Sequence, residues 1–358
     1  MLPSVLLRHS QPERLNASDM RTIATTSVPQ PRTALTLLRN NATRRRLTML
    51  RPCSESQSES QKADCEFELG LGITEIAGSA GCGKTQIALG VCVACACTPF
   101  KTKAQDSSDS SEHAPFGKAL FVSLGEGTTK PMIAKRLFQM AETRKAEHLA
   151  TNTNTNTNTN TNTNTNTNTN TNNNLEDQTV TSVLNRILTR FIRNQDEFEL
   201  FVFHELHKLL EKDQDIAFIA MDSIASMFRA SDGKHSLDAA ERSGLFFRVA
   251  AQLKKLSEHH LVPFIIVNQV TADFKSKEGN AVRPALGLSW ANCVNESYLL
   301  SRNETTQNEE AGRLQTTFKF RRTIRCRFSP SHYPDETSFV IDVGGAKGLS
   351  PKTTHTLL

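Results

Sequence analysis

One segment decides the fold of this chain: Gly78-Ser79-Ala80-Gly81-Cys82-Gly83-Lys84-Thr85. It matches the pattern G-x-x-x-x-G-K-S/T, in which glycines allow backbone N–H groups to turn inward around phosphate groups. The apolar residues Ile73 to Ala77 precede it, and a helical pattern from Lys84 to Cys97 follows it. A helix N-terminus adds positive potential at such a turn. The segment therefore predicts a phosphate-binding loop between a buried strand and a helix.

Two residues of the loop, with one acid elsewhere, carry the chemistry expected of an ATP and magnesium site. Lys84 would reach the β- and γ-phosphates, and the Thr85 hydroxyl would bind magnesium. A magnesium site needs a further acid, and the end of a neighbouring buried strand is the natural place for it. Asp222 directly follows the apolar residues Ile216 to Met221, so we expect it to coordinate magnesium through water.

Hydrolysis also needs a group that activates or positions water. Glu126 stands just past the apolar residues Ala119 to Leu124, and Gln269 stands just past Val262 to Val267. A parallel sheet delivers both side chains to the edge that holds the phosphates. The predicted catalytic residues are therefore Lys84, Glu126 and Gln269, although Glu126 and Gln269, each taken alone, are equally consistent with polar loop residues.

Strands and helices are expected to alternate along most of the chain. Apolar runs of strand length indicate strands buried on both faces, and such strands separated by helices predict a mostly parallel sheet covered by helices on both sides. The expected strands are Ile73 to Ala77, Ala119 to Leu124, Arg186 to Ile192, Ile216 to Met221 and Val262 to Val267. The expected helices are Lys84 to Cys97, Pro131 to His148, Asp196 to Glu211 and Ser236 to His259. Glu296 to Ser301, Thr316 to Phe328 and Ser338 to Val343 alternate in polarity, which predicts an antiparallel C-terminal edge.

Composition divides the chain into an arm, one large domain and a tail. Residues 1–62 form a basic arm and linker, typical of a mitochondrial presequence, a degenerate helical domain or a disordered tail. Residues 63–350 form the domain, interrupted by low-complexity insertions at 101–113 and 151–174, and residues 351–358 form the tail. The second insertion repeats Thr-Asn and has no apolar side chains to bury, so it predicts a solvated loop.

Charge and hydropathy restrict the functions that bulk composition supports. The net charge is +5, and the excess lies in the first 51 residues, which hold nine Arg, no Lys and two acids. Bulk charge therefore does not argue for nucleic-acid binding by the domain. No apolar run approaches the roughly 18 residues that a membrane-spanning helix needs. The eight cysteines show no regular spacing, and Cys92-Val-Ala-Cys95 lies within an apolar run that predicts small buried residues rather than a metal site.

Several segments together resemble the RecA-type recombinases, and within that family the eukaryotic paralogues that act in DNA repair. The resemblance covers roughly residues 65 to 348 without the insertions. It rests on Ile73-Thr-Glu-Ile-Ala-Gly78 through Gln86, Met221-Asp-Ser-Ile-Ala225, Val267-Asn-Gln-Val-Thr271 and Ala285-Leu-Gly-Leu-Ser-Trp-Ala-Asn292. The Gly-rich segment that usually precedes the first strand is reduced here to Glu68-Leu-Gly-Leu-Gly72.

The resemblance implies a RecA-like P-loop ATPase core that works in homologous recombination and double-strand-break repair. It implies that Asp222 is the Walker B acid, that Glu126 activates water, that Gln269 senses the phosphate and that Arg136 lies near the adenine. Two DNA loops would map to Arg229 through Leu237 and to Thr271 through Gly287, which predicts DNA binding by Arg229, Lys234, Lys275, Lys277 and Arg283. A solvated-loop interpretation of these five charges stays open.

The same resemblance suggests the binding partners of this chain, its location in the cell and its rate of ATP hydrolysis. The partners would be single-stranded or branched DNA, a related recombinase paralogue and the main recombinase, in a hetero-oligomer without a membrane. Ser329 to Pro334 occupies the place where the family caps a neighbour's nucleotide. The family suggests the nucleus, whereas the Arg-rich arm suits a mitochondrion. The expected activity is a weak DNA-dependent ATPase; the alternatives are a nucleotide-binding scaffold subunit with little or no hydrolysis, and a small-molecule kinase.

Overall fold

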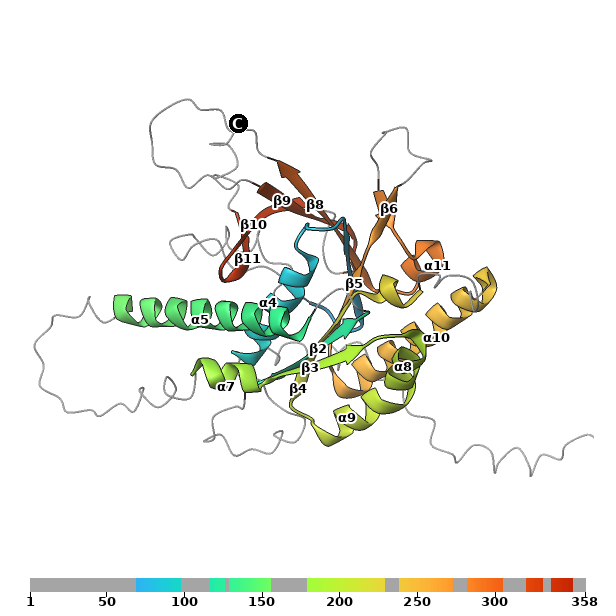
Figure 1. The fold of residues 1–358 in the computed structure, drawn as a ribbon, viewed down its shortest axis with the longest axis horizontal. Helices are drawn as coiled ribbons and strands as arrows, with labels where there is room; N and C mark the ends of the chain where they lie inside the picture. Colours follow the sequence, from blue (N-terminus) through green and yellow to red (C-terminus); the bar gives the residue numbers. More distant parts are fainter. Residues whose placement is uncertain are drawn as a thin grey trace, which may run out of the picture. The chain divides into compact units, whose positions relative to one another are not determined.

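A twisted sheet runs through the centre of the computed structural model of this chain (Figure 1). The structure describes residues 69–97, 116–125, 129–155, 179–228, 238–272, 282–304, 320–330 and 336–349. Within these ranges the main sheet has nine strands in the order β11-β10-β9-β8-β1-β5-β4-β2-β3. The predictions for the basic arm, the linker, the first insertion and the C-terminal tail concern residues outside the described ranges.

The larger part of the sheet is parallel. Strand β1 (Ile73–Gly78) pairs with β5 on one side and with β8 on the other, and β5, β4, β2 and β3 continue the sheet in parallel. The bounds are β2 (Lys118–Leu124), β3 (Ile187–Ile192), β4 (Ile216–Asp222), β5 (Phe264–Asn268) and β8 (Glu296–Glu304). Every residue of β1 and β5 is buried, as expected for strands covered on both faces. The parallel α/β sheet predicted from the sequence is confirmed.

The remaining strands of the sheet are antiparallel and close its C-terminal edge. They are β9 (Phe320–Phe328), β10 (Glu336–Asp342) and β11 (Gly345–Gly348). The predicted antiparallel C-terminal edge is confirmed, and it begins within β8, which is parallel to β1 on one side and antiparallel to β9 on the other. An alternating pattern reports which face of a strand is buried, not its direction. The strand β11 was not predicted.

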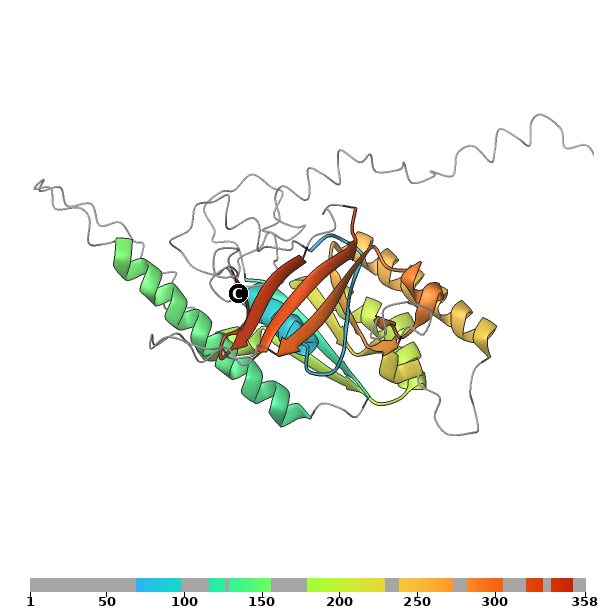
Figure 2. The ribbon, with the colours of Figure 1, turned by 90° about the horizontal axis from the view of Figure 1, so that it is seen from above.

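One face of the sheet is covered by α4 (Lys84–Ala96), α5 (Lys130–Thr155) and α7 (Val180–Asn185) (Figure 1). Their apolar side chains form one core cluster with inward side chains of the sheet, including Phe339 and Ala346 from the C-terminal strands. Figure 2 shows these orange and red strands lying over the blue helix α4. Cys92 and Cys95 are free, buried thiols within α4, so the prediction of small buried residues is confirmed.

The other face is covered by a second set of helices. The segment predicted as one helix from Asp196 to Glu211 is divided into α8 (Gln195–Leu200), the π-helical turn η3 (Phe201–Glu205) and α9 (Leu206–Lys212). Helices α10 (Ala239–His260) and α11 (Gly287–Ala291) complete this layer. They share a second core cluster with β2, β4 and β5. No helix among the described residues has the length and apolar character needed to cross a membrane.

Helix α5 differs from its predicted extent. It continues to Thr155, so the first five residues of the Thr-Asn segment are helical rather than loop. Extending an existing helix gains a backbone hydrogen bond for each residue that is fixed, without the cost of a new nucleus. Residues 156–174 of that segment lie outside the described residues.

Candidate nucleotide-binding site

The phosphate-binding loop connects the buried strand β1 to the N-terminus of α4, as the sequence predicts. Gly83 is the residue that caps α4, and its φ of 106° lies in the left-handed region that favours glycine. A Cβ atom at Gly83 would also lie 2.6 Å from Ile341 Cδ1. The backbone of the loop therefore passes so close to the Ile341 side chain that a side chain at position 83 would require Ile341 to move.

Lys84 lies over the carbonyl groups of the loop. Its Nζ atom donates hydrogen bonds to Gly78 O at 2.7 Å and to Ser79 O at 2.8 Å. Burial lowers the pKa of Lys84, and the neighbouring Cys82 and Asp222 oppose that shift. A partly buried cation is poorly solvated, so an anionic phosphate at this point would stabilise its charge.

Thr85 and Asp222 come together from distant parts of the chain. The Thr85 hydroxyl donates a hydrogen bond to Asp222 Oδ2, joining the first turn of α4 to the last residue of β4. Burial raises the pKa of the Asp222 carboxyl group, although the Thr85 bond and Lys84 oppose the shift. A hydroxyl and a carboxylate oxygen are the donors that magnesium takes beside nucleotide phosphates and water. These two residues therefore fit a magnesium ion bound together with a nucleotide.

The raised pKa of Asp222 predicts that magnesium-dependent nucleotide binding, if measured, depends on pH. An acid with a raised pKa takes up a proton at a higher pH than an ordinary aspartate, whose pKa is about 3.9. We therefore expect the magnesium-dependent part of ATP affinity to fall as the pH drops through the raised pKa of Asp222, at a higher pH than for an ordinary aspartate. Calorimetric titrations with and without magnesium between about pH 7.5 and pH 4.5 would measure it. In Asp222→Asn the magnesium dependence should be absent at every pH, and its persistence there would contradict the assignment.

A buried hydrogen-bond network fixes the end of β5 beside this site. Glu75 of β1 is fully buried and accepts hydrogen bonds from Asn268 Nδ2 at 2.8 Å and from Ser297 Oγ at 2.7 Å. Asn268 Oδ1 then accepts a hydrogen bond from the backbone N–H of Gln269 at 2.8 Å. The network therefore joins β1 to both neighbouring strands and sets where Gln269 leaves the sheet.

Glu75 should be worth a measurable part of the stability. Glu75→Leu removes both acceptor oxygens, so Asn268 Nδ2 and Ser297 Oγ are left without these bonds in the buried interior. We expect the free energy of unfolding to fall by about 1–3 kcal/mol, measured by urea denaturation. Glu142→Leu on the exposed side of α5 is the matched control and should change it by less than about 0.5 kcal/mol. Equal effects of the two substitutions would show that the network does not hold β1.

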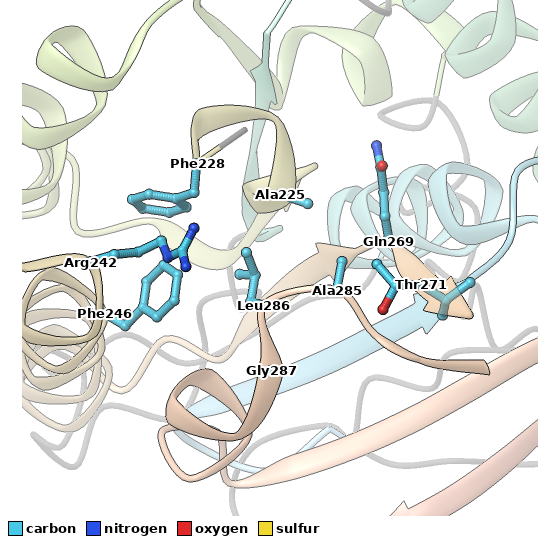
Figure 3. Close-up of a pocket in the computed structure, with 10 residues that line it drawn as sticks. Ala225, Phe228, Arg242, Phe246, Gln269, Thr271, Ala285, Leu286 and Gly287 are labelled. Atoms are coloured by element: carbon cyan, nitrogen blue, oxygen red, sulfur yellow. The ribbon is translucent and has the colours of Figure 1, made fainter. Parts of the chain in front are cut away.

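Gln269 lies between Ser223, which follows Asp222 at the end of β4, and a pocket. Its Nε2 atom donates to Ser223 Oγ at 3.5 Å, a long contact with the residue that follows Asp222. It also lines a cavity of about 430 Å³. Figure 3 shows Phe228, Arg242 and Phe246 gathered at one end of this pocket and Gln269 at the other. The remaining lining residues are Ala225, Val270, Thr271, Ala285, Leu286 and Gly287.

Arg136 connects α5 to α4 and to the C-terminal end of β10. It donates hydrogen bonds to the side chains of Gln86 and Gln139 and to the backbone oxygens of Asp342 and Val343. These bonds hold its guanidinium beside Gln86, the second residue after Lys84 in α4. Its contact with adenine stays a prediction.

Six residues remain from the predicted catalytic and DNA-binding sets. The structure describes one of them and leaves five outside its described residues. Arg283 is exposed on β7 (Val282–Pro284), where it pairs with Thr271 of β6 (Val270–Ala272). Glu126, the water-activating candidate, lies outside the described residues, as do Arg229, Lys234, Lys275 and Lys277. Sequence reasoning did not assign a role to Glu75, although a carboxylate inside an apolar strand is a detectable signal.

A parallel sheet with a glycine loop, Lys84, Thr85 and a strand-end Asp222 defines the class of P-loop nucleoside triphosphatases. A family model described as "AAA domain" matches residues 61–314, and the chain belongs to this family. A comparison with curated proteins finds the DNA repair protein XRCC3 homolog of Arabidopsis thaliana, 32% identical over 105 residues, which are 25% of this chain and 34% of the relative.

Two further relatives are also DNA repair proteins. The DNA repair protein RAD51 homolog 3 of Dictyostelium discoideum is 30% identical over 113 residues, 31% of this chain and 28% of the relative. The DNA repair and recombination protein RadB of Methanosphaera stadtmanae is 29% identical over 80 residues, 22% of this chain and 33% of the relative. The matches span about a third of the length of these relatives. They confirm the resemblance to RecA-type repair proteins.

Proposed function

We propose that this chain is an ATP-dependent, DNA-binding protein of homologous recombination and double-strand-break repair, acting as a recombinase paralogue or mediator. The observation that carries the proposal is the junction of Lys84, Thr85 and Asp222 at the edge where β1 and β4 end. The relatives, all DNA repair proteins by name, support the repair role. ATP and magnesium are the cofactors of this proposal.

In the proposed site, each of a few residues has a distinct role in binding or hydrolysing ATP. The backbone of Gly78 through Thr85 surrounds the phosphates, and Lys84 exchanges its carbonyl partners for phosphate oxygens. Thr85 and Asp222 hold magnesium, which, when bound, neutralises charge on the phosphates. Glu126 follows Gly125 at the end of β2, and we assign it the role of accepting a proton from the attacking water.

Gln269 is the proposed connection between nucleotide and DNA. Its side chain contacts Ser223 beside the magnesium acid and also lines the pocket between η4 (Ile224–Phe228), α10 and the β6–β7 hairpin. A hydrogen bond from Gln269 to the terminal phosphate would be lost after hydrolysis, so the hairpin would respond to the state of the nucleotide. In the sequence, the pocket residue Phe228 directly precedes the first proposed DNA loop, and the pocket residue Thr271 begins the second.

DNA binding is proposed to be electrostatic and indifferent to base sequence. Arg283 on the exposed hairpin, with Arg229, Lys234, Lys275 and Lys277, would neutralise phosphates of single-stranded or branched DNA. We propose a related recombinase paralogue and the main recombinase as protein partners in a hetero-oligomer. The nucleus is the proposed location, and the Arg-rich arm leaves a mitochondrial location as the alternative.

Binding of the full chain to labelled single-stranded DNA tests the DNA part of this proposal. We expect tighter binding with ATP than with ADP, and affinity that falls as salt rises. Arg283→Ala should reduce the salt slope by about 0.7, the value for one phosphate contact on a single strand. Arg193→Ala, an exposed arginine beyond β3, should leave the slope unchanged. A slope that is equal in all three proteins would remove Arg283 from the interface.

A further inference from the structure

Two arginines of the C-terminal strands face the phosphate-binding loop. On β8 the side chains of Tyr298 and Leu300 are buried in the core cluster around α4. Arg302 is the next residue in that row, because alternate residues of a strand share a face. Arg322 of β9 lies directly opposite Arg302 in the sheet. Both arginines therefore belong to the face that covers α4 and the loop.

Arg302 is in direct contact with the loop. A Cβ atom placed on Gly81 would lie 2.7 Å from Arg302 Nη1 and 3.5 Å from Cζ. Gly81 has a φ of 77° and carries no side chain, which leaves the space that the guanidinium takes. The guanidinium thus lies over the segment whose backbone would surround the phosphates.

Positive charge accumulates at this point at a cost to the protein. Arg322 Nε is buried and has no hydrogen-bond partner among the residues that the structure describes. Burial and the charge of Arg302 lower the pKa of Arg322, and Cys82 of the loop opposes the shift. Like charges directly opposite each other in a sheet destabilise it. Lys84, whose pKa burial also lowers, lies in the same loop. A bound anion would relieve this repulsion.

We propose that Arg302, supported by Arg322, binds the terminal phosphate of the nucleotide held by the loop of the same chain. This inference rests on the proposed function and adds a residue that distinguishes ATP from ADP. A guanidinium presents two parallel N–H donors that match two phosphate oxygens, and such charged hydrogen bonds are strong. Arg322 does not touch the nucleotide in this proposal; its charge, opposite Arg302 in the sheet, adds to the positive potential at the loop.

Competition binding of ATP and ADP to the full chain tests the proposal. Arg302→Gln should weaken ATP binding about tenfold or more, since a hydrogen bond to a charged group contributes about 1.5–3 kcal/mol and about 1.4 kcal/mol is tenfold. ADP affinity should change less than about threefold, below 0.7 kcal/mol by the same conversion. The thermal midpoint without nucleotide should stay equal or rise, because a repulsion is removed. Arg325→Gln, exposed on the opposite face of β9, should bind both nucleotides as the unchanged protein does.

The outcomes separate this inference from the proposed function. Lys84→Ala, which should lose ATP affinity, first establishes that the loop binds ATP. Given that loss, two results would overturn the assignment of Arg302: unchanged ATP affinity in Arg302→Gln, or equal losses of ATP and ADP affinity. Absence of ATP binding by the unchanged protein would overturn the proposed function itself. If Arg302→Gln does not fold, Arg302→Lys keeps the charge without the two-pronged geometry. That variant should lose ATP affinity severalfold while keeping its ADP affinity, and unaltered ATP affinity would contradict the proposal.

Discussion

Lys84→Ala should lower the affinity of the full chain for ATP by about a hundredfold or more. Lys84 now donates to two carbonyl oxygens, Gly78 O and Ser79 O, and in the proposed site its ammonium group would donate to phosphate oxygens instead. Two hydrogen bonds to a charged group, at about 1.5–3 kcal/mol each, correspond to at least that factor. Alanine keeps the helix-forming character of the first turn of α4. Isothermal titration calorimetry with ATP and magnesium would measure the loss.

The fold should survive this substitution. Burial lowers the pKa of Lys84, which means that its charge is held at some cost in the free protein. The free energy of unfolding should therefore change by less than about 1 kcal/mol. Lys135→Ala on the exposed side of α5 is the matched control and should change neither quantity. ATP affinity in Lys84→Ala equal to that of the control would remove Lys84 from the site.

Phe246→Ala should produce the largest loss of stability among the substitutions considered. Phe246 is only 2% exposed, in the core between α10 and the sheet. Its ring centroid lies 4.8 Å from that of Phe228 and 5.9 Å from that of Trp290, in edge-on geometry that stabilises aromatic pairs. Truncating a buried phenylalanine costs about 3–5 kcal/mol, because the cavity that remains is only partly filled.

The chain provides its own control and its own probe for this prediction. Phe247 is the next residue of α10 but is 51% exposed, so Phe247→Ala should cost less than about 1 kcal/mol. Trp290 is the single tryptophan of the chain and is fully buried against Phe246. Its emission should shift in Phe246→Ala and stay constant in Phe247→Ala. Equal losses of stability in urea denaturation would contradict the packing described for α10.

The sequence was sufficient for the parallel part of the fold because its signals are local. A glycine loop between an apolar run and a helix specifies β1 and α4, and continuous apolar runs specify β4 and β5. The parallel pairing of β8 with β1 was not predictable, because an alternating pattern is expected of β8 whether it pairs parallel or antiparallel with a neighbouring strand. Its parallel pairing with β1 depends on the path of the chain through α11. The boundary of α5 was also missed, since composition predicts a loop where the helix continues.

The candidate site was predictable to the extent that each residue belongs to a local motif. Lys84 and Thr85 follow from the loop, and Asp222 follows from an acid placed after a buried strand. Glu75 and Arg302 act through contacts between strands that are far apart in the sequence, as the Glu75 to Ser297 bond across 222 residues illustrates. Such contacts depend on the order of strands in the sheet. Glu126 and the loop cations stay predictions.

The central claim is that ATP bound at Lys84, Thr85 and Asp222 is coupled to DNA. The most direct measurement is ATP turnover by the full chain with and without single-stranded DNA, beside Lys84→Ala. We predict slow turnover that DNA stimulates and that Lys84→Ala abolishes. ATP binding without turnover would instead favour the nucleotide-binding scaffold. Turnover that persists in Lys84→Ala, or that DNA leaves unchanged, would contradict the account.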